Sequence, residues 1–150
     1  MVNIRLATVE DLPRIFAIEQ ETISPPWTED AIASEITREG SYFIVADDGG
    51  IKGFAFVRQV GYDGEILQIA VDKSVQRSGI GDLLMKTILE YADENNFQSV
   101  FLEVRYGNIA AINLYKKHGF SILRVRKKSY ESPVEDALVM KRGESLLYSN

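Results

Sequence analysis

The chain of 150 residues contains no cysteine and a single histidine, His118. The lack of cysteine excludes disulfides, thiolate metal sites and an acyl-cysteine intermediate. One histidine argues against a Ser-His-Asp triad and against a multi-histidine metal centre, so we expect no metal site. Any acyl transfer by this chain must therefore use another route. His118 precedes Gly119 at a predicted helix end, where it fits a partner of the helix dipole.

Long apolar runs and excess positive charge are also lacking. No stretch reaches the length of a membrane span, and no signal-peptide pattern is visible. The 17 lysines and arginines stand against 22 acidic residues, and the net charge of −5 argues against broad nucleic-acid binding. We therefore expect a cytoplasmic protein with no membrane partner and no direct nucleic-acid partner, although a basic protein tail could be attracted.

Hydrophobic periodicity divides the chain into strands and helices in the order β-α-α-β-β-β-α-β-α-β-β. This order predicts an α/β fold with a mixed sheet. The length suits one domain with one core, which we assign to residues 1–142, with a C-terminal tail at residues 143–150. A long helix is expected at about residues 82–95, and a polar loop at residues 127–136 should separate the last two strands.

Residues 102–120, with the sequence LEVRYGNIAAINLYKKHGF, join a predicted strand to a predicted helix. Alternation places Glu103 in an otherwise apolar sheet, on the face opposite Val100, Leu102 and Val104. A carboxylate in such surroundings needs a reason, because burying an unpaired charge destabilises a fold. Glu103 is therefore a candidate for chemistry, and the alternative is a structural ion pair with Arg105 or a helix residue.

The helix that follows carries a phenol, Tyr115. Asn108 stands where the helix N-cap belongs, and Tyr115 returns to the same face two turns later. Gly119 is predicted to end the helix as the residue after its C-cap. Ordinary core packing would also explain a tyrosine at position 115, so spacing alone leaves both interpretations open.

A glycine-containing loop follows an apolar strand and precedes an amphipathic helix; it comprises Gln76, Arg77, Ser78, Gly79, Ile80 and Gly81. Exposed backbone N–H groups and the helix dipole favour an anion there, and a pyrophosphate would fit. The two glycines let a phosphate approach the backbone closely. The loop is neither a Walker loop nor a complete dinucleotide fingerprint, so a plain strand-to-helix turn is the alternative.

Four passages together resemble the GNAT superfamily of acetyl-coenzyme A dependent N-acetyltransferases, and within it the RimI family of ribosomal-protein-alanine N-acetyltransferases. They are IRLATVEDLPRIFAIEQ, PPW at residues 25–27, LQIAVDKSVQRSGIGDLLM and LEVRYGNIAAINLYKKHGF. The resemblance implies the GNAT fold, in which about four helices flank a central mixed, mostly antiparallel sheet of about seven strands. It also implies acetyl-CoA as cosubstrate and direct transfer to an amine.

The resemblance further implies where the donor binds. In this family the pattern Gln/Arg-x-x-Gly-x-Gly/Ala, matched here by Gln76, Gly79 and Gly81, binds the pyrophosphate of acetyl-CoA. Backbone groups of the preceding strand would contact the pantetheine arm, and one N–H would hold the acetyl carbonyl as an oxyanion donor. The strand residues concerned are Ile69, Ala70 and Val71. Asn108 would contact the cofactor as well as capping its helix.

Acetyl transfer to an amine requires two proton handlers, one for the ammonium and one for the departing thiolate. Glu103 is the candidate base, acting directly or through a water, because burial tunes a carboxylate toward proton abstraction. Tyr115 is the candidate acid, because a phenol with a pKa of about 10 stays protonated at neutral pH.

By resemblance, Trp27 and Tyr130 would form opposite walls of the acceptor channel, although Trp27 can equally be a core anchor. A basic cluster near the second wall is usually a solvated strand end, and secondarily a site for CoA phosphate or ribosomal RNA; it comprises Arg124, Arg126, Lys127 and Lys128.

The leading hypothesis is an enzyme that acetylates the N-terminal α-amine of a protein, expected to be an N-terminal alanine of a ribosomal protein. The ordinary pKa is about 7.7 to 8.0 for an α-amine and about 10.4 for lysine, which makes deprotonation of the α-amine easier by roughly 3.4 kcal/mol. An acetyltransferase for small amines, polyamines or lysine is the second hypothesis. The third is a non-catalytic GNAT module that binds CoA or a partner, and the joint presence of Glu103 and Tyr115 speaks against it.

Overall fold

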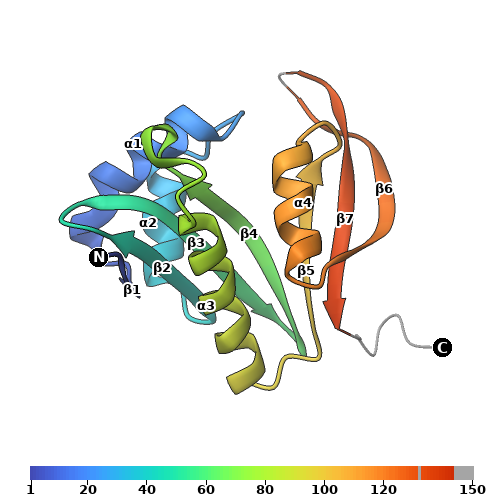
Figure 1. The fold of residues 1–150 in the computed structure, drawn as a ribbon, viewed down its shortest axis with the longest axis horizontal. Coiled ribbons are helices and arrows are strands. Elements are labelled where there is room, and N and C mark those ends of the chain that lie inside the picture. Colours follow the sequence, from blue (N-terminus) through green and yellow to red (C-terminus); the bar gives the residue numbers. More distant parts are fainter. Residues whose placement is uncertain (132, 144–150) are drawn as a thin grey trace.

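A computed structural model describes residues 1–131 and 133–143. Over these residues the chain forms one seven-stranded sheet and four α-helices, in the predicted order (Figure 1). The strands are β1 (Asn3–Leu6), β2 (Ser41–Asp47), β3 (Ile51–Val60), β4 (Asp63–Val71), β5 (Ser99–Arg105), β6 (Ser121–Tyr130) and β7 (Glu135–Gly143). The helices are α1 (Leu12–Thr22), α2 (Glu29–Thr37), α3 (Ile80–Glu94) and α4 (Ile109–Lys117).

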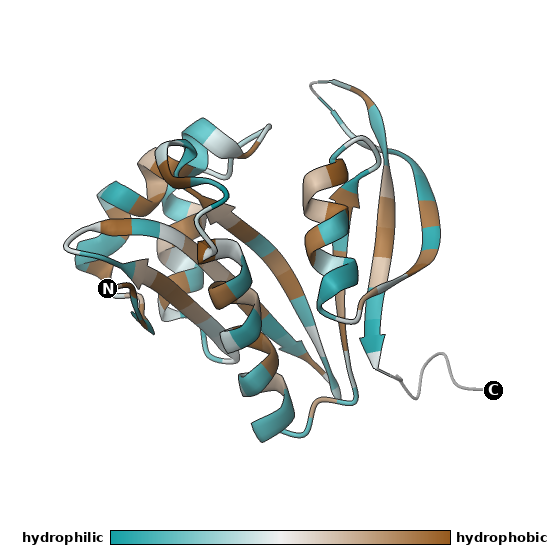
Figure 2. Cartoon of the chain, in the orientation of Figure 1, coloured by the Kyte–Doolittle hydropathy of each residue, from teal (hydrophilic) through white to brown (hydrophobic). Residues whose placement is uncertain are grey.

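The sheet has the strand order β1-β2-β3-β4-β5-β7-β6, and only its β4–β5 pair is parallel. The predicted mixed, mostly antiparallel sheet is therefore confirmed. Alternate residues of β2 enter two separate apolar cores: Phe43 and Val45 pack with α1 and α2, whereas Ile44 and Ala46 pack with α3. Figure 2 shows apolar residues concentrated on the central strands and polar residues on the outer sides of the helices. No helix in the described part of the chain has the length and apolarity needed to cross a membrane.

Two sequence-based boundaries were wrong. Helix α3 begins at Ile80, two residues before the predicted start, because Gly79 adopts a left-handed conformation (φ +89°) and serves as its N-cap. The expected polar loop at residues 127–136 is mostly a β-hairpin, since β6 runs to Tyr130 and β7 starts at Glu135. The carboxylate of Asp136 accepts hydrogen bonds from Lys127 Nζ and from the Lys128 backbone N–H, which stabilises charged residues within the hairpin. Apart from Gly143, which ends β7, the predicted tail lies outside the described residues.

The sheet is split along the line between β4 and β5. Their parallel pairing covers only four residue pairs and ends at Ile66 with Leu102, although both strands continue beyond that point. On its other side, β4 contains a bulge, because Val57 pairs with Ile66 and Phe56 pairs with Gln68, so Leu67 is the extra residue. A bulge bends its strand and increases its twist. Strands β4 and β5 consequently meet at one end and separate at the other, as Figure 1 shows.

Candidate active site

A cavity of about 550 Å³ lies where β4 and β5 separate. Its size is within the usual range for small-molecule sites. One side is formed by the α1–α2 loop, which comprises residues 23–28 and includes Trp27. The opposite side is formed by β5, α4 with its N-cap, and the end of β6, including Glu103, Tyr115 and Tyr130. The cavity therefore brings together six of the residues selected from the sequence, namely Trp27, Ile69, Glu103, Asn108, Tyr115 and Tyr130.

Glu103 is not buried, and this prediction was wrong. The strand alternation itself is correct, because Val100, Leu102 and Val104 are buried on the opposite face. The Glu103 side chain, however, is 31% exposed. Helices α1 and α2 pack mainly on β2, β3 and β4, so they leave this face of β5 open. Burial therefore cannot tune Glu103 as a base.

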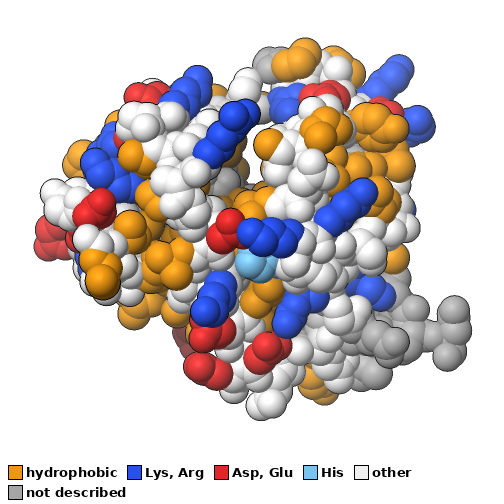
Figure 3. Space-filling model, viewed as in Figure 1, with side chains coloured by type: hydrophobic (Ala, Val, Ile, Leu, Met, Phe, Trp, Pro, Cys, Tyr) orange, Lys and Arg blue, Asp and Glu red, His pale blue; other side chains and the backbone are white. Residues whose placement is uncertain are grey.

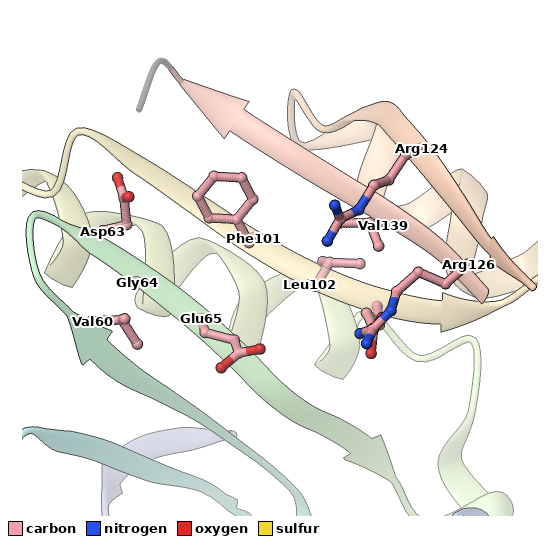
Figure 4. Close-up of a pocket in the computed structure, with 10 residues that line it drawn as sticks. Val60, Asp63, Gly64, Glu65, Phe101, Leu102, Arg124, Arg126 and Val139 are labelled. Atoms are coloured by element: carbon pink, nitrogen blue, oxygen red, sulfur yellow. The ribbon is translucent and has the colours of Figure 1, made fainter. Parts of the chain in front are cut away.

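The ion-pair alternative for Glu103 holds, but with a different partner. Arg126 Nη1 of β6 donates to Glu103 Oε1 at 2.5 Å, whereas Arg105 contacts other groups. Glu103 also borders a second hollow of about 220 Å³ on the open side of β5. In Figure 4, Arg124 and Arg126 reach from β6 over Val139 toward this hollow, opposite Glu65 of β4. Glu103 thus lies at the boundary between two cavities.

Tyr115 is at once a core residue and a cavity residue. Its side chain is 7% exposed, belongs to the core formed by α3, α4 and the sheet, and meets the ring of Phe120 edge-on at 6.1 Å. It also borders the main cavity together with Glu103. Burial raises the pKa of the Tyr115 phenol above its usual value. The group therefore stays protonated over the whole physiological pH range and can act as a proton donor.

The ends of α4 are as predicted. Asn108 Oδ1 accepts a hydrogen bond from the Ala111 N–H at 3.2 Å, which makes Asn108 the N-cap, and the residue also borders the cavity. Gly119 follows the C-cap with φ +93°, a conformation that favours glycine.

His118 is the C-cap of α4, and its Nε2 lies 2.9 Å from Asp82 in the first turn of α3. This contact, together with a Lys117–Asp82 ion pair at 3.0 Å, joins the two helices that face each other across the opening.

The predicted anion loop is folded tightly at the start of α3. Gln76 Nε2 donates to the Val71 carbonyl at 3.4 Å, and the Ser78 hydroxyl donates to the Val75 carbonyl. Arg77 (φ +66°) and Gly79 both lie in the left-handed region. The N–H groups of the first turn of α3 have no intrahelical partner, so they can bind an anion. Figure 3 shows the surface hollowed on this face, with lysine and arginine side chains on both sides.

Two further groups complete the donor side. Gly81 lies close to α4, because a Cβ atom added to it would come into van der Waals contact with Leu114 at 3.4 Å. On β4, Ile69, Ala70 and Val71 pair with β3 through one edge, while the other edge lies beyond the last β4–β5 pair. That second edge leaves backbone hydrogen-bonding groups available to a ligand. Among the described residues, no group of histidine, aspartate and glutamate side chains is arranged to hold a metal ion.

The two walls predicted for an acceptor contain Trp27, Tyr130 and a residue, Arg105, that sequence reasoning treated only as an ion-pair candidate. The Trp27 ring meets Phe56 edge-on at 5.3 Å, so Trp27 is both a core anchor and a cavity wall. Arg105 stacks over the Tyr130 ring at 4.5 Å. It also donates to the carbonyl of Ser24 in the α1–α2 loop and, at 2.8 Å, to that of Glu131 after β6. Arg105 thus bridges the two walls, and no local sequence signal could reveal bonds to backbone carbonyls distant in the chain.

The fold, a mixed seven-stranded sheet that opens between two parallel strands over a cavity containing a carboxylate and a phenol, is that of an α/β protein with an enzyme-like cleft. The model of the Acetyltransferase (GNAT) family matches residues 6–120, and the chain belongs to this family of acetyl-CoA dependent N-acetyltransferases. The predicted family, fold and enzyme class are confirmed, and the hypothesis of a non-catalytic module is not favoured.

Individual relatives agree over nearly the whole chain. The ribosomal protein bS18-alanine N-acetyltransferase of Escherichia coli is 33% identical over 132 residues, which cover 87% of this chain and 89% of that protein. The N-alpha-acetyltransferase RimI of Mycobacterium tuberculosis is 30% identical over 148 residues, which cover 94% and 92%. The crystal structure of the Escherichia coli ribosomal-protein-S18-alanine N-acetyltransferase is similar with a TM-score of 0.89 and 29% identity, covering 100% of this chain and 99% of that one.

Proposed function

We propose that this enzyme transfers acetyl from acetyl-CoA directly to the N-terminal α-amine of a protein, the alanine of ribosomal protein bS18. The observation that carries this proposal is that Glu103 and Tyr115 border one cavity at the point where β4 and β5 separate. The acceptor class is supported by a relative at 33% identity named for the alanine of ribosomal protein bS18 and by one at 30% named an N-alpha-acetyltransferase. Because a ribosomal protein would be acetylated in the cytoplasm, we also propose that the enzyme is cytoplasmic.

In the proposed reaction, Glu103 accepts a proton from the acceptor ammonium, either directly or through a water. The free amine attacks the acetyl carbonyl, and the bond between the carbonyl carbon and sulfur breaks. Of the two protons that the nitrogen loses, one leaves to solvent through Glu103. The second, released from the nitrogen of the tetrahedral intermediate, replaces the proton that Tyr115 gives to the departing thiolate, so Tyr115 ends the cycle protonated. The raised pKa of Tyr115 supports this role, because the phenol then carries its proton at neutral pH.

The donor is proposed to lie along the free edge of β4. Backbone groups of Ile69, Ala70 and Val71 would contact the pantetheine arm, and one N–H would stabilise the oxyanion of the tetrahedral intermediate. The pyrophosphate would bind the N–H groups around Gln76, Arg77, Ser78, Gly79, Ile80 and Gly81, where the dipole of α3 favours negative charge. Asn108 would contact the donor from the start of α4. Trp27 and Tyr130 would enclose the acceptor from opposite sides.

The identity of the acceptor is tested by incubating the enzyme with acetyl-CoA and a panel of amines. The panel contains peptides that begin with alanine, the same peptides with a blocked N-terminus and an internal lysine, and polyamines. Mass spectrometry locates the added acetyl group. We expect modification of the free α-amine of the alanine peptides and little modification of lysine, because the α-amine is easier to deprotonate by roughly 3.4 kcal/mol. Preferential acetylation of polyamines or lysine would overturn the proposal.

A further inference from the structure

A fully buried carboxylate, Glu19 of α1, lies behind the acceptor cavity and has no part in the proton transfers described above. Its exposed fraction is 0%, and it belongs to the helix that packs on β3 and β4. Glu19 Oε2 accepts two hydrogen bonds, both at 2.9 Å. One comes from the backbone N–H of Trp27 and the other from Nε2 of Gln68. One carboxylate oxygen therefore joins the α1–α2 loop to strand β4.

Both partners of Glu19 border the acceptor cavity, whereas Glu19 itself does not. Trp27 is the aromatic residue of the α1–α2 wall. Gln68 directly follows Leu67, the extra residue of the bulge that turns β4 away from β5. The carboxylate thus connects one wall of the cavity to the position at which the cavity opens. A change at Glu19 would shift both groups together.

The placement of Glu19 is unfavourable for stability. Glu19 Oε1 and Gln68 Oε1 are both buried without a hydrogen-bond partner among the described residues. Burial raises the pKa of Glu19, as expected for a carboxyl group removed from water. Its surroundings are the apolar core of Ile15, Ile18, Phe54 and Phe56, where a hydrophobic side chain would avoid the cost of burying a polar group. A destabilising group held in such a position points to a role in the site.

We infer that Glu19 is a positioning residue of the acceptor site, which sets the separation of Trp27 and Gln68 and thereby acceptor affinity. The inference deepens the proposed function and rests on it for the nature of the acceptor. The carboxylate acts through these two neighbours and does not touch the reacting atoms. Loss of the anchor should therefore raise the KM for the acceptor. The KM for acetyl-CoA should stay unchanged, because the donor contacts lie further along β4 and in the loop at residues 76–81.

The test compares Glu19→Leu with Glu19→Gln in initial-rate assays with an alanine-starting peptide. Leucine removes the carboxylate oxygen that accepts the hydrogen bonds from Trp27 and Gln68. We therefore expect the peptide KM to rise about tenfold, with the acetyl-CoA KM within about twofold of the parent. Glutamine keeps one oxygen for the two donors, so its peptide KM should lie close to that of the parent. If Glu19→Leu does not fold, Gln68→Leu removes one arm of the anchor, and the same separation of the two KM values is expected.

A matched control is Glu35→Gln. Glu35 of α2 is also a buried carboxylate, 3% exposed, and it pairs with Arg58 at 2.5 Å without bordering the acceptor cavity. Its substitution should alter thermal stability and leave both KM values unchanged. An unchanged peptide KM in folded Glu19→Leu, or equal rises in both KM values, would refute the inference. If the parent instead acetylates only polyamines, the proposed function fails, and the same comparison with the polyamine still tests Glu19.

Discussion

The guanidinium of Arg126 holds the carboxylate of Glu103 at 2.5 Å, on the side of the sheet that extends beyond α1 and α2. A charge-assisted hydrogen bond of this kind orients a carboxylate that is otherwise free to rotate. The pair also connects β6, the edge strand of the sheet, to the proposed base on β5. We therefore expect the contact with Arg126 to prepare the Glu103 carboxylate for its proposed role, and not the burial that alternation along β5 had suggested.

Substitution of Arg126 by glutamine should therefore lower kcat about tenfold, because a misplaced base transfers protons less efficiently. Arg124→Gln is the matched control. Arg124 borders the same hollow from the same strand, and no hydrogen bond or ion pair links it to Glu103 among the described residues. Steady-state rates with the alanine-starting peptide decide the matter. Equal effects of the two substitutions would show that general charge near the hollow matters and that the specific pair does not.

Glu103→Gln tests the base itself. The amide has nearly the same shape but cannot accept a proton, so kcat should fall by about two orders of magnitude or more. Binding of acetyl-CoA, measured by the rise in melting temperature on ligand addition, should match that of the parent. A variant that retains more than about half of the parent rate would show that another group, or bulk water, removes the proton.

Tyr115→Phe removes the phenol hydroxyl and leaves the core packing against Phe120 in place. We expect kcat to fall by about two orders of magnitude, because the thiolate then departs without a proton donor. Since burial raises the pKa of Tyr115, the parent should show no loss of rate from this group as the pH rises through about 10. A decline in the parent with an apparent pKa below about 10 that disappears in Tyr115→Phe would contradict the raised pKa.

Arg105→Lys tests the bridge between the two acceptor walls. Lysine keeps the positive charge but lacks the planar fork that reaches the carbonyls of Ser24 and Glu131. The peptide KM should rise several-fold, on the order of fivefold, while the acetyl-CoA KM stays constant. Limited proteolysis gives an independent measurement, since both walls should be cut faster in the variant. An unaltered peptide KM with faster cleavage would limit Arg105 to a structural role.

Asp72 provides a prediction on pH. The backbone N–H and hydroxyl of Ser74, followed by Arg14, lower the pKa of Asp72 to about 2. A lowered carboxylate pKa means that its stabilising contribution is present above the unfolded value of about 3.9 and is lost as the pH falls through about 2. Asp72→Asn should therefore melt at a lower temperature than the parent at pH 7, and the difference should shrink between about pH 4 and pH 2. Asp93→Asn, at an exposed ion pair, should show a much smaller effect.

The sequence predicted those parts of the structure that depend on local rules. Alternation identified the two faces of β5, and the predicted capping residue Asn108 fixes the start of α4 through a hydrogen bond in the structure. The exposure of Glu103 could not be predicted, because it depends on where α1 and α2 end relative to β5. The bridging role of Arg105 and the anchor at Glu19 rely on backbone partners 81 and 8 residues away, which carry no side-chain signature. Leu67 lies between Ile66 and Gln68 with no glycine or proline beside it, so the bulge carried no sequence signal either.

That bulge gives the sheet interior edges in addition to the outer edges at β1 and β6. An exposed strand edge usually invites pairing with another chain, but the inner edges of β4 and β5 lie within the molecule and border the main cavity. In the proposed binding mode, a CoA arm with amide groups would pair with this unfinished part of the sheet in place of a missing strand. Closing the sheet by removal of Leu67 would improve backbone pairing and eliminate the site.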